Sequence, residues 1–395
     1  MTLIYCSLSW LLGSYTILKL RQVKWYQAII RLGSASLVSL ASAIMIGYFF
    51  RLQPTNILFF RGTLIPLFLG LSLWSGIWRI TLRRSWPQNQ GSRWQVLALP
   101  EEINMINAEW NNRHENNNQL PTAKISIYTT KKNIKKNTPL AISPGCISHY
   151  SLQELSENSI YQGLAIHSMV EMAEEEMQRI PARWVGSQWL LFANQIDGEK
   201  TSFNKQFKRY TDVITSLLIV LLTSPFVLLA CLLVKLQDGG PIFYKQRRTG
   251  LLGSTFEIIK IRTMGVKAES SGPQWSQPND QRITPIGKWL RRTRLDEIPQ
   301  LWNVLKGDMS LIGPRPERPE FDIFLEKNIP NYKLRNWIRP GLTGWAQINI
   351  PYSSSEEDSE IKLSYDLYYI RNRSTWLDAI ILLKTIKIIL KASGR

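Results

Sequence analysis

Four long apolar stretches interrupt a chain of 395 residues and set its first divisions. Three of them open the chain, at about 1–18, 32–50 and 57–78, and the fourth covers 213–234. Each is close to the ~20 residues that a membrane-spanning helix needs. The pattern predicts that residues 1–80 form about three transmembrane helices. The first stretch has the length of a signal peptide, but it lacks a preceding basic region and a clear cleavage site, so a true span is favoured.

The charges of the connecting loops give these predicted spans a direction. Residues 1–80 contain no Asp or Glu, and their basic residues gather between the first and second apolar stretches. A second basic group follows the third stretch, from Arg79 to Arg93. Loops rich in Lys and Arg stay on the cytoplasmic side of a membrane. The N-terminus is therefore expected outside, and residue 85 in the cytoplasm.

The fourth apolar stretch, 213–234, contains Ser224 and Pro225 near its middle. Proline removes a backbone hydrogen bond and kinks a helix. Basic residues lie on both flanks of the stretch, so both flanks are predicted on the cytoplasmic side. Two alternatives remain open, a fourth spanning helix and a bent re-entrant helix that enters and leaves the same leaflet. The flanking charges and the proline favour the re-entrant helix.

Between these membrane segments, residues 81–200 alternate short apolar runs with helix-like stretches. The runs typical of strands lie at 93–99, 123–129, 140–143, 161–166 and 187–193. The helix-like stretches are 101–112 and 168–179. This alternation predicts a Rossmann-like α/β domain with a small parallel sheet. A dinucleotide-binding turn needs glycines after its first strand. Here the turn reads LPEEIN, so this domain is not expected to bind a nucleotide.

The chain is strongly basic, with 48 Lys and Arg against 30 Asp and Glu and a net charge of +18. Such an excess indicates an anionic partner. Because long apolar stretches accompany the charge, membrane lipids and phosphate groups are favoured over nucleic acid. The three cysteines are widely spaced and odd in number, which argues against a disulfide framework. The three histidines have no zinc-ligand spacing with a cysteine or with one another.

The segment 239–264, GGPIFYKQRRTGLLGSTFEIIKIRTM, predicts a strand, a glycine turn and a second strand. It places Lys260 and Arg262 on the second strand. Arginine and lysine near a membrane often contact only lipid headgroups, and that alternative applies to both residues. Arginine also suits phosphate oxygens, because its donors form a rigid fork.

An Asp-Glu dipeptide, Asp296 and Glu297, follows a helix start predicted at Thr284-Pro285. Ordinary ion pairs on a helix would account for it, since Glu297 lies three residues after Arg294. Its surroundings are unusual, however, because several basic residues flank the two carboxylates. A carboxylate pair in such a setting can bind a divalent cation, and aspartate can act as a nucleophile on phosphorus.

Residues 205–395 resemble the bacterial sugar transferase family, the monotopic polyprenyl-phosphate phosphoglycosyl transferases. The resemblance covers the region in ordered blocks. They are FKRYTDVI (207–214), SP (224–225), GPIFYKQRRTG (240–250), FEIIKIRTM (256–264), RITPIGKWLRRTRLDEIPQLWNVLKGDMSLIGPRPERPEF (282–321), RPGLTGWAQIN (339–349) and KLSYDLYYIRNRSTWLDAIILLKTI (362–386). The whole layout is similar to the larger galactose- or glucose-1-phosphate members. It departs from them in having three predicted spans rather than four, and in lacking the glycine turn.

The resemblance implies a mixed α/β membrane protein whose mainly helical catalytic domain, 205–395, carries a re-entrant helix at 213–234. The implied reaction moves a sugar-1-phosphate from a UDP-sugar to undecaprenyl or another polyprenyl phosphate, with release of UMP. Asp296 would attack the sugar-bearing phosphate and form a covalent intermediate. Glu297, with Asp296, would bind Mg2+. The implied location is the bacterial cytoplasmic (inner) membrane, with the catalytic domain facing the cytoplasm.

Several basic residues are expected to hold the substrate. Those predicted to contact phosphate are Lys260, Arg262, Arg291 and Arg315. Arg339 and Gln347 are predicted at the nucleotide or glycan end of the site. The layout favours galactose or glucose as the sugar and the first membrane step of exopolysaccharide, capsule or O-antigen synthesis. A homodimer is an open expectation.

Two other functions remain as alternatives. A glycosyltransferase that moves the sugar without its phosphate would release UDP rather than UMP. A non-catalytic scaffold of a polysaccharide machine would release neither, although the Asp296–Glu297 pair and its basic neighbours speak against it.

Overall fold

The structure is a computed structural model. It describes residues 93–111, 124–129, 138–149, 165–186, 202–266, 280–350 and 355–390, together with residues 40, 66, 69–70, 73–74, 77, 134, 189 and 268. The predicted transmembrane helices therefore lie almost entirely outside the described residues. Nearly all of the described chain belongs to one compact unit, formed by Gln95–His114 and Ile127–Arg395.

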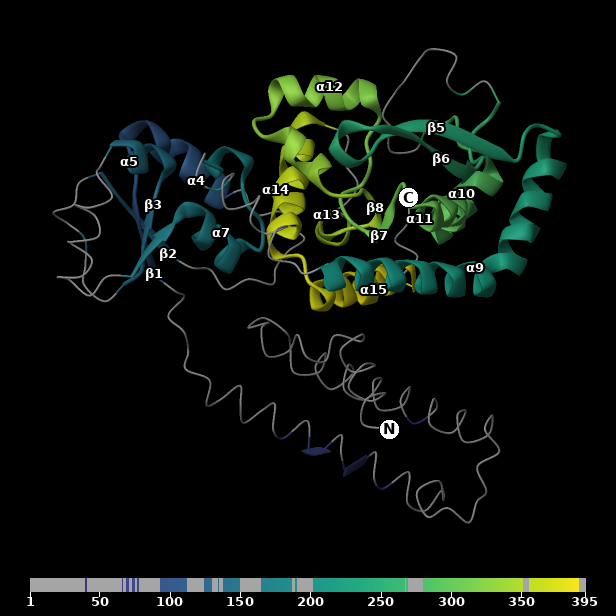
Figure 1. The fold of residues 1–395 in the computed structure, drawn as a ribbon, viewed down its shortest axis with the longest axis horizontal. Helices are drawn as coiled ribbons and strands as arrows, with labels where there is room; N and C mark the ends of the chain where they lie inside the picture. The colour runs from purple at the N-terminus through teal and green to yellow at the C-terminus, as the bar shows by residue number, and fades with distance from the viewer. Residues whose placement is uncertain are drawn as a thin grey trace. The chain divides into compact units, whose positions relative to one another are not determined.

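The middle segment folds around a four-stranded sheet in the order β2-β1-β3-β4 (Figure 1). The strands are β1 (Arg93–Leu97), β2 (Lys124–Tyr128), β3 (Leu140–Ile142) and β4 (Ile166–Ser168). β1 pairs with β3, and β3 pairs with β4, both in parallel. The prediction of a small parallel sheet is thus confirmed for these strands.

Short helices follow the strands of this sheet, among them helices in the predicted stretches 101–112 and 168–179. They are η3 (Pro100–Glu102), α4 (Ile103–Asn111), α5 (Pro144–His149), α7 (Met169–Met177) and η5 (Ala182–Trp184). Ser168 begins α7 because its hydroxyl accepts a hydrogen bond from the backbone of Glu171, whose carboxylate accepts one from the backbone of Ser168.

The strand prediction at 187–193 is wrong at Trp189, which is the residue of that run that the structure describes. Trp189 is helical, and its backbone N–H donates to the carbonyl of Gly186. The run SQWLLFA contains no β-branched residue, and a short apolar run does not by itself distinguish a strand from a helix. The run at 161–166 is described only at its end, where β4 begins with Ile166.

The turn without glycines after β1 is closed by the carboxylate of Glu102. That carboxylate accepts hydrogen bonds from the Ser143 hydroxyl at 2.5 Å, the Gly145 N–H at 3.0 Å and the Leu99 N–H at 3.1 Å. The carboxyl ends of β1 and β3 therefore carry an acidic group where dinucleotide-binding folds receive a pyrophosphate. This acidic group disfavours a phosphate at the same edge.

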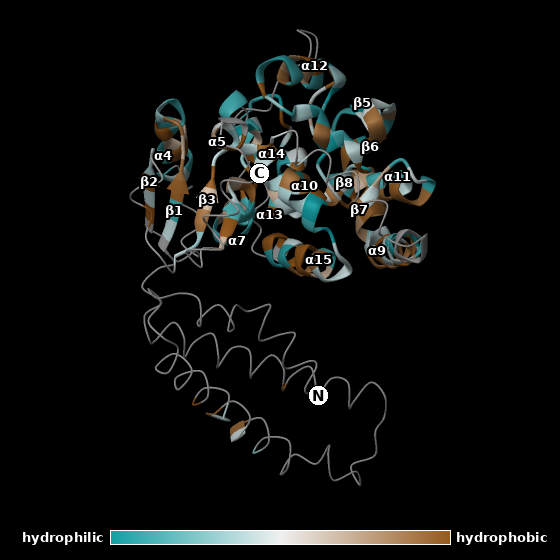
Figure 2. Ribbon diagram, turned by 60° about the vertical axis from the view of Figure 1, so that its left-hand side comes forward, coloured by the Kyte–Doolittle hydropathy of each residue, from teal (hydrophilic) through white to brown (hydrophobic). Residues whose placement is uncertain are grey.

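A long apolar helix, α9 (Ser202–Asp238), opens the second half of the chain and includes Pro225. Its ribbon changes direction sharply along its length (Figure 1). Figure 2 shows apolar residues along much of α9, and Leu221, Leu222 and Leu228 are each at least 70% exposed. Within the described residues, Gln206–Asp238 is the helix that is long and apolar enough to cross a membrane. The last turns of α9 pack through Ala230 and Val234 against the domain that follows.

The predicted strand–turn–strand is confirmed as an antiparallel hairpin. β5 (Phe243–Thr249) pairs with β6 (Thr255–Ile261) along its whole length, and η6 (Leu251–Gly253) joins them. Gly253 in this turn has a φ of +81°, a conformation that glycine adopts without steric cost. The hairpin aligns Tyr244 with Lys260.

A broken helical segment follows the hairpin. α10 (Pro285–Thr293) begins where the sequence predicts, since the Thr284 hydroxyl accepts from the Gly287 N–H at 3.0 Å. A single helix through Asp296 is not found. Arg294 has a φ of 59°, which ends α10, and η7 (Leu295–Gln300) and α11 (Leu301–Lys306) follow in a new direction.

The remaining elements are mostly helical, as expected of this region. They are β7 (Ser310–Ile312), α12 (Pro319–Asn328), η8 (Tyr332–Trp337), β8 (Gly341–Thr343), α13 (Trp345–Asn349), α14 (Glu356–Asn372) and α15 (Thr375–Leu390). β7 and β8 are parallel and approach closely, because a Cβ on Gly341 would lie 2.1 Å from the Gly313 nitrogen. This close contact fixes the start of the segment that carries Arg315.

Candidate active site

A cavity of about 400 Å³ lies beside the β5–β6 hairpin, between that hairpin, η7 and α14. It brings together six of the residues predicted from the sequence. They are Lys260, Arg262, Arg291, Asp296, Glu297 and Arg315. These residues come from β6 and its end, α10, η7 and the segment after β7, so the fold assembles one site from distant parts of the region.

Asp296 is buried, with 7% of its surface exposed. The left-handed conformation of Arg294 turns the chain so that η7 places Asp296 and Glu297 at the cavity. Asp296 Oδ1 has no hydrogen-bond partner among the described residues. Burial, together with the charge of Glu297, raises the pKa of the Asp296 carboxyl to about 6, against the opposing effect of Lys260 and Arg291. The side chain is therefore a desolvated carboxyl with an open acceptor atom.

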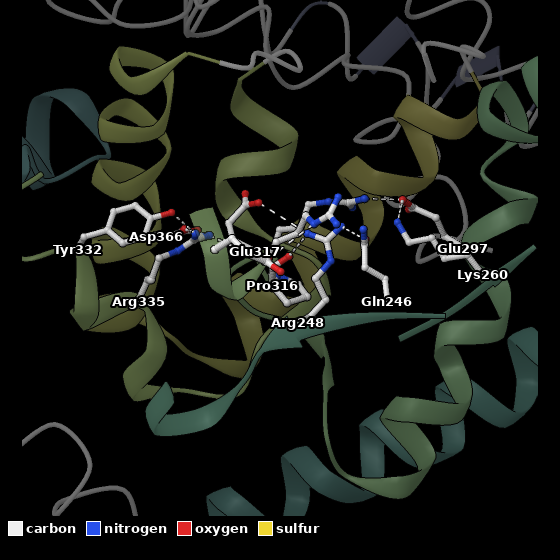
Figure 3. Close-up of polar contacts among 12 residues, drawn as sticks. Gln246, Arg248, Lys260, Glu297, Pro316, Glu317, Tyr332, Arg335 and Asp366 are labelled. Carbon is white, nitrogen blue, oxygen red and sulfur yellow. Dashed lines mark hydrogen bonds and ion pairs between the residues drawn. The ribbon is translucent and has the colours of Figure 1, made fainter. Parts of the chain in front are cut away.

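Glu297 has the opposite environment, because three cations surround it. Glu297 Oε1 lies 2.5 Å from Arg315 Nη2 and 3.8 Å from Lys260 Nζ, while Oε2 lies 3.3 Å from Arg294 Nη1. Figure 3 shows Glu297 and Lys260 side by side. These cations hold the pKa of the Glu297 carboxyl well below its usual range, although burial acts in the other direction. Glu297 therefore stays ionised and fixes the basic side chains around it.

Lys260 and Arg291 are desolvated cations beside the carboxylate pair. Burial lowers the pKa of the Lys260 amine to about 8, although Glu297 counteracts it. Burial also lowers the pKa of Arg291, whose Nε donates to Thr263 Oγ1 at 3.0 Å. Both side chains have their charge in a poorly hydrated place, where an anionic ligand would interact with it strongly.

Arg262 also lines the cavity, but its guanidinium is bound to a carboxylate. It donates to both oxygens of Asp238, at the end of α9, and Nε donates to the carbonyl of Pro241 at 2.6 Å. This bidentate pair ties the apolar helix to the hairpin. The geometry therefore gives Arg262 a structural role in addition to any contact with phosphate.

Two predicted residues lie elsewhere in the described region. Neither Arg339 nor Gln347 lines the cavity. Arg339 is exposed in the segment before β8, and Gln347 Nε2 donates to the carbonyl of Leu342 at 3.2 Å. Ser224 and Pro225 lie within α9, where the Ser224 hydroxyl donates to the Leu221 carbonyl at 2.9 Å.

The cavity includes basic residues that the sequence reasoning did not place in the site, among them Arg248, Arg294, Arg318 and Lys362. Arg248 stands in the QRRTG block, and Arg294 has the i,i+3 spacing to Glu297, so both had a local signal. Lys362 lies on α14 more than sixty positions after Asp296, and its lowered pKa reflects burial. With these residues the cavity is strongly cationic, which suits a ligand with two or more negative charges.

The described residues thus combine a cationic cavity that contains a carboxylate pair with an exposed apolar helix long enough to cross a membrane. The profile of the bacterial sugar transferase family matches residues 203–392. The chain is 41% identical over 181 residues, covering 45% of this chain and 68% of the relative, to the UDP-glucose:undecaprenyl-phosphate glucose-1-phosphate transferase of Caulobacter vibrioides. The chain belongs to the bacterial sugar transferase family.

Two further relatives each match a little under half of the chain. The UDP-N-acetylgalactosamine-undecaprenyl-phosphate N-acetylgalactosaminephosphotransferase of Aeromonas hydrophila is 44% identical over 187 residues, which are 47% of this chain and 44% of the relative. The UDP-glucose:undecaprenyl-phosphate glucose-1-phosphate transferase of Escherichia coli (strain K12) is 38% identical over 192 residues, which are 48% of this chain and 41% of the relative. The matched part thus spans less than half of these two relatives.

Proposed function

We propose that this protein transfers a sugar-1-phosphate from a UDP-sugar to undecaprenyl phosphate or a similar polyprenyl phosphate, through Asp296. One observation carries the proposal: Asp296 lines a cavity together with desolvated cations, and one of its carboxylate oxygens has no hydrogen-bond partner among the described residues. Such an oxygen suits attack on phosphorus, and the cations suit the diphosphate of the donor. Relatives whose names describe this transfer support the same conclusion.

The proposed reaction has two steps. In the first, an Asp296 oxygen forms a bond to the sugar-bearing phosphorus, and the bond from that phosphorus to the bridging oxygen breaks. UMP leaves with the bridging oxygen. In the second, a phosphate oxygen of the polyprenyl phosphate forms a bond to the same phosphorus, and the bond to Asp296 breaks. Lys260, Arg291 and Arg315 would stabilise the charge that develops on the phosphoryl oxygens.

The carboxylate pair also fits a magnesium ion. Mg2+ prefers oxygen ligands and usually takes one or two carboxylates together with substrate phosphates. Asp296 offers an oxygen that no described residue binds, and Glu297 is ionised beside it. We therefore propose that Glu297 and Asp296 hold Mg2+ when the diphosphate is present. Bound there, the ion would neutralise charge on the departing phosphate.

The membrane arrangement is proposed from the substrates and from α9. Polyprenyl phosphate keeps its headgroup at the bilayer surface, and a re-entrant α9, bent near Ser224 and Pro225, would hold the cavity at that depth. Residues 1–80 are proposed as transmembrane helices, 81–200 as a Rossmann-like cytoplasmic domain and 205–395 as the catalytic domain. The location proposed is the bacterial cytoplasmic membrane, with surrounding lipids in contact with α9 and the catalytic domain on the cytoplasmic side.

The sugar is proposed to be a hexose, with galactose or glucose favoured by the layout of the chain. The names of the relatives give UDP-glucose and UDP-N-acetylgalactosamine as donors, so the donor class common to them is a UDP-linked hexose or N-acetylhexosamine. The product would open exopolysaccharide, capsule or O-antigen synthesis at the membrane. A homodimer would agree with the proposed layout.

The nucleotide product tests the reaction. Membranes that contain the full chain, incubated with undecaprenyl phosphate and a panel of UDP-sugars, are expected to release UMP with at least one donor, and chromatography of the nucleotides measures it. A covalent intermediate also predicts a stoichiometric burst of UMP without acceptor. UDP as the sole nucleotide product would favour sugar transfer without phosphate, and release of neither nucleotide would favour the scaffold.

Metal removal tests the magnesium site. Treatment with EDTA should lower UMP release by about two orders of magnitude, because several kcal/mol of charge stabilisation is lost with the ion. Added Mg2+ should restore activity. The second measurement is UDP binding by calorimetry, which should weaken in EDTA. Unchanged UMP release and unchanged UDP affinity in EDTA would contradict the magnesium proposal and leave the reaction itself standing.

A further inference from the structure

The segment Pro314–Glu317, which joins β7 to α12, has no regular secondary structure, yet each of its four carbonyls is hydrogen-bonded. The Pro314 carbonyl accepts from the Gly341 N–H at 2.8 Å, and the Glu317 carbonyl accepts from the Thr249 N–H at 2.9 Å. Two of the four residues are prolines and have no N–H to donate. Donors from other elements therefore bind every carbonyl of this segment.

The two central carbonyls are held by arginine side chains. Arg335 Nη2 donates to the Arg315 carbonyl at 2.8 Å, and Arg248 Nη1 donates to the Pro316 carbonyl at 3.0 Å. Figure 3 shows Arg248 next to Pro316, and Arg335 beside Tyr332 and Asp366. The donors come from η8 and β5, which lie far from the segment in sequence.

Each of these arginines is itself oriented by further partners, which are buried for Arg335 and partly buried for Arg248. Arg335 lies 3.1 Å from Asp366 on α14, with side-chain exposures of 5% and 2%, and Nη1 donates to the Tyr332 hydroxyl at 2.6 Å. Arg248 Nη2 donates to Gln246 Oε1 at 2.5 Å, and Nη1 lies 3.7 Å from Glu317. Guanidinium groups bound on several edges have little freedom to move, so the carbonyls that they bind are also fixed.

We infer that Arg335 is a positioning residue, which holds the backbone of Arg315 so that its side chain reaches Glu297 and the phosphate-binding end of the cavity. Arg248 binds the next carbonyl, that of Pro316, and itself lines the cavity. Arg335 does not line the cavity, and its link to the site runs through the Arg315 carbonyl. The side chain of the same residue, Arg315, makes the 2.5 Å contact with Glu297. This inference rests on the proposed function, because it assigns Arg315 to the substrate diphosphate.

A buried ion pair could instead serve only stability, and the two roles differ in one measurable way. A positioning residue acts through Arg315, so its loss should matter little once the Arg315 side chain is gone. A purely structural residue should reduce activity by the same factor in both backgrounds. The free-energy effects of two mutations are not additive when one residue acts through the other. When the residues act independently, the factors by which each mutation lowers the rate multiply.

The test is a double-mutant cycle on the full chain in membranes. Arg335→Met is combined with Asp366→Leu, so that no buried charge is left unpaired. This pair should lower UMP release about 10- to 100-fold, since a displacement of about 1 Å in a positioning group has effects of that size. In an Arg315→Ala background the same pair should lower it by less than about twofold.

Arg209→Met is the matched control, because Arg209 also donates to two backbone carbonyls, those of Val304 and Leu305, but lies outside the cavity lining. The factor by which Arg209→Met lowers UMP release should be the same with and without Arg315→Ala. Hydrogen exchange of a peptide covering 311–318 gives a second readout that needs no activity: exchange should quicken in the Arg335–Asp366 variant and not in Arg209→Met.

The possible outcomes distinguish a failure of the positioning role from a failure of the proposed function. Multiplicative losses for the Arg335–Asp366 pair, or unchanged exchange at 311–318, would overturn the positioning role. Full activity of Arg315→Ala would contradict the proposed phosphate contact. Faster exchange in the Arg335–Asp366 variant would then still support the hold of Arg335 on the Arg315 backbone. Absence of UMP release by the unmodified chain would count against the proposed function, whereas the exchange comparison would still decide the positioning.

Discussion

Asp296→Asn is expected to lower UMP release about 10⁴-fold or more, because the amide cannot form the proposed bond to phosphorus. The substitution is nearly isosteric, so the cavity keeps its shape. Burial already raises the pKa of this carboxyl to about 6, which means that the folded chain is destabilised by the ionised form. Removing the charge should therefore leave the melting temperature unchanged or raise it slightly. Nucleotide chromatography and a thermal scan measure the two effects.

Asp308→Asn provides the control for this substitution. Asp308 forms a partly exposed ion pair with Lys306 at 3.5 Å and does not line the cavity. Its replacement should leave UMP release within about twofold of the unmodified chain, since exposed ion pairs contribute little. Mass spectrometry should find a phosphosugar adduct on the peptide that contains Asp296 in the unmodified chain and in Asp308→Asn. An adduct on another residue, or full activity of Asp296→Asn, would contradict the assignment of Asp296 as the nucleophile.

The elements that local sequence rules specify were predicted well. The hairpin follows from two alternating runs and a glycine turn between them, and the start of α10 follows from Thr284 and Pro285. Six predicted residues line one cavity, among them Asp296 and Arg315. Their residue types and their sequence blocks were visible in the sequence, whereas other basic residues of the lining, such as Arg318 and Lys362, were not placed in the site.

The contacts that decide each residue's role were not predictable, because they join distant segments. Arg262 pairs with Asp238 across 24 positions, and the sequence offers no rule that distinguishes this pair from a phosphate contact. Arg335 reaches the Arg315 carbonyl across 20 positions and Asp366 across 31. The end of α10 at Arg294 was also missed, since the left-handed conformation there is adopted by an arginine rather than by glycine.

Glu297→Gln should separate the roles of the two neighbouring acidic residues. Glu297 is ionised and contacts three cations, of which Arg315 at 2.5 Å is the nearest. The amide would leave Lys260 and Arg315 without their carboxylate, so both are free to bind the diphosphate more tightly. It would also weaken the proposed magnesium site. The expected result is a kcat about 100-fold lower with an unchanged or lower KM for the UDP-sugar, because the interaction lost acts on the transition state.

Kinetics at several Mg2+ concentrations measure this result, with Glu326→Gln as the control. Glu326 pairs with the exposed Lys333 at 3.4 Å and does not line the cavity, so its variant should keep both constants. A higher KM with an unchanged kcat in Glu297→Gln would contradict a role for Glu297 in turnover and make it a simple binding residue. The prediction follows from the asymmetry of the pair: Asp296 has an open acceptor atom in a desolvated place, while Glu297 is held ionised by its neighbours. The environment of Asp296 suits the proposed nucleophile, and that of Glu297 suits a group that organises the surrounding charges.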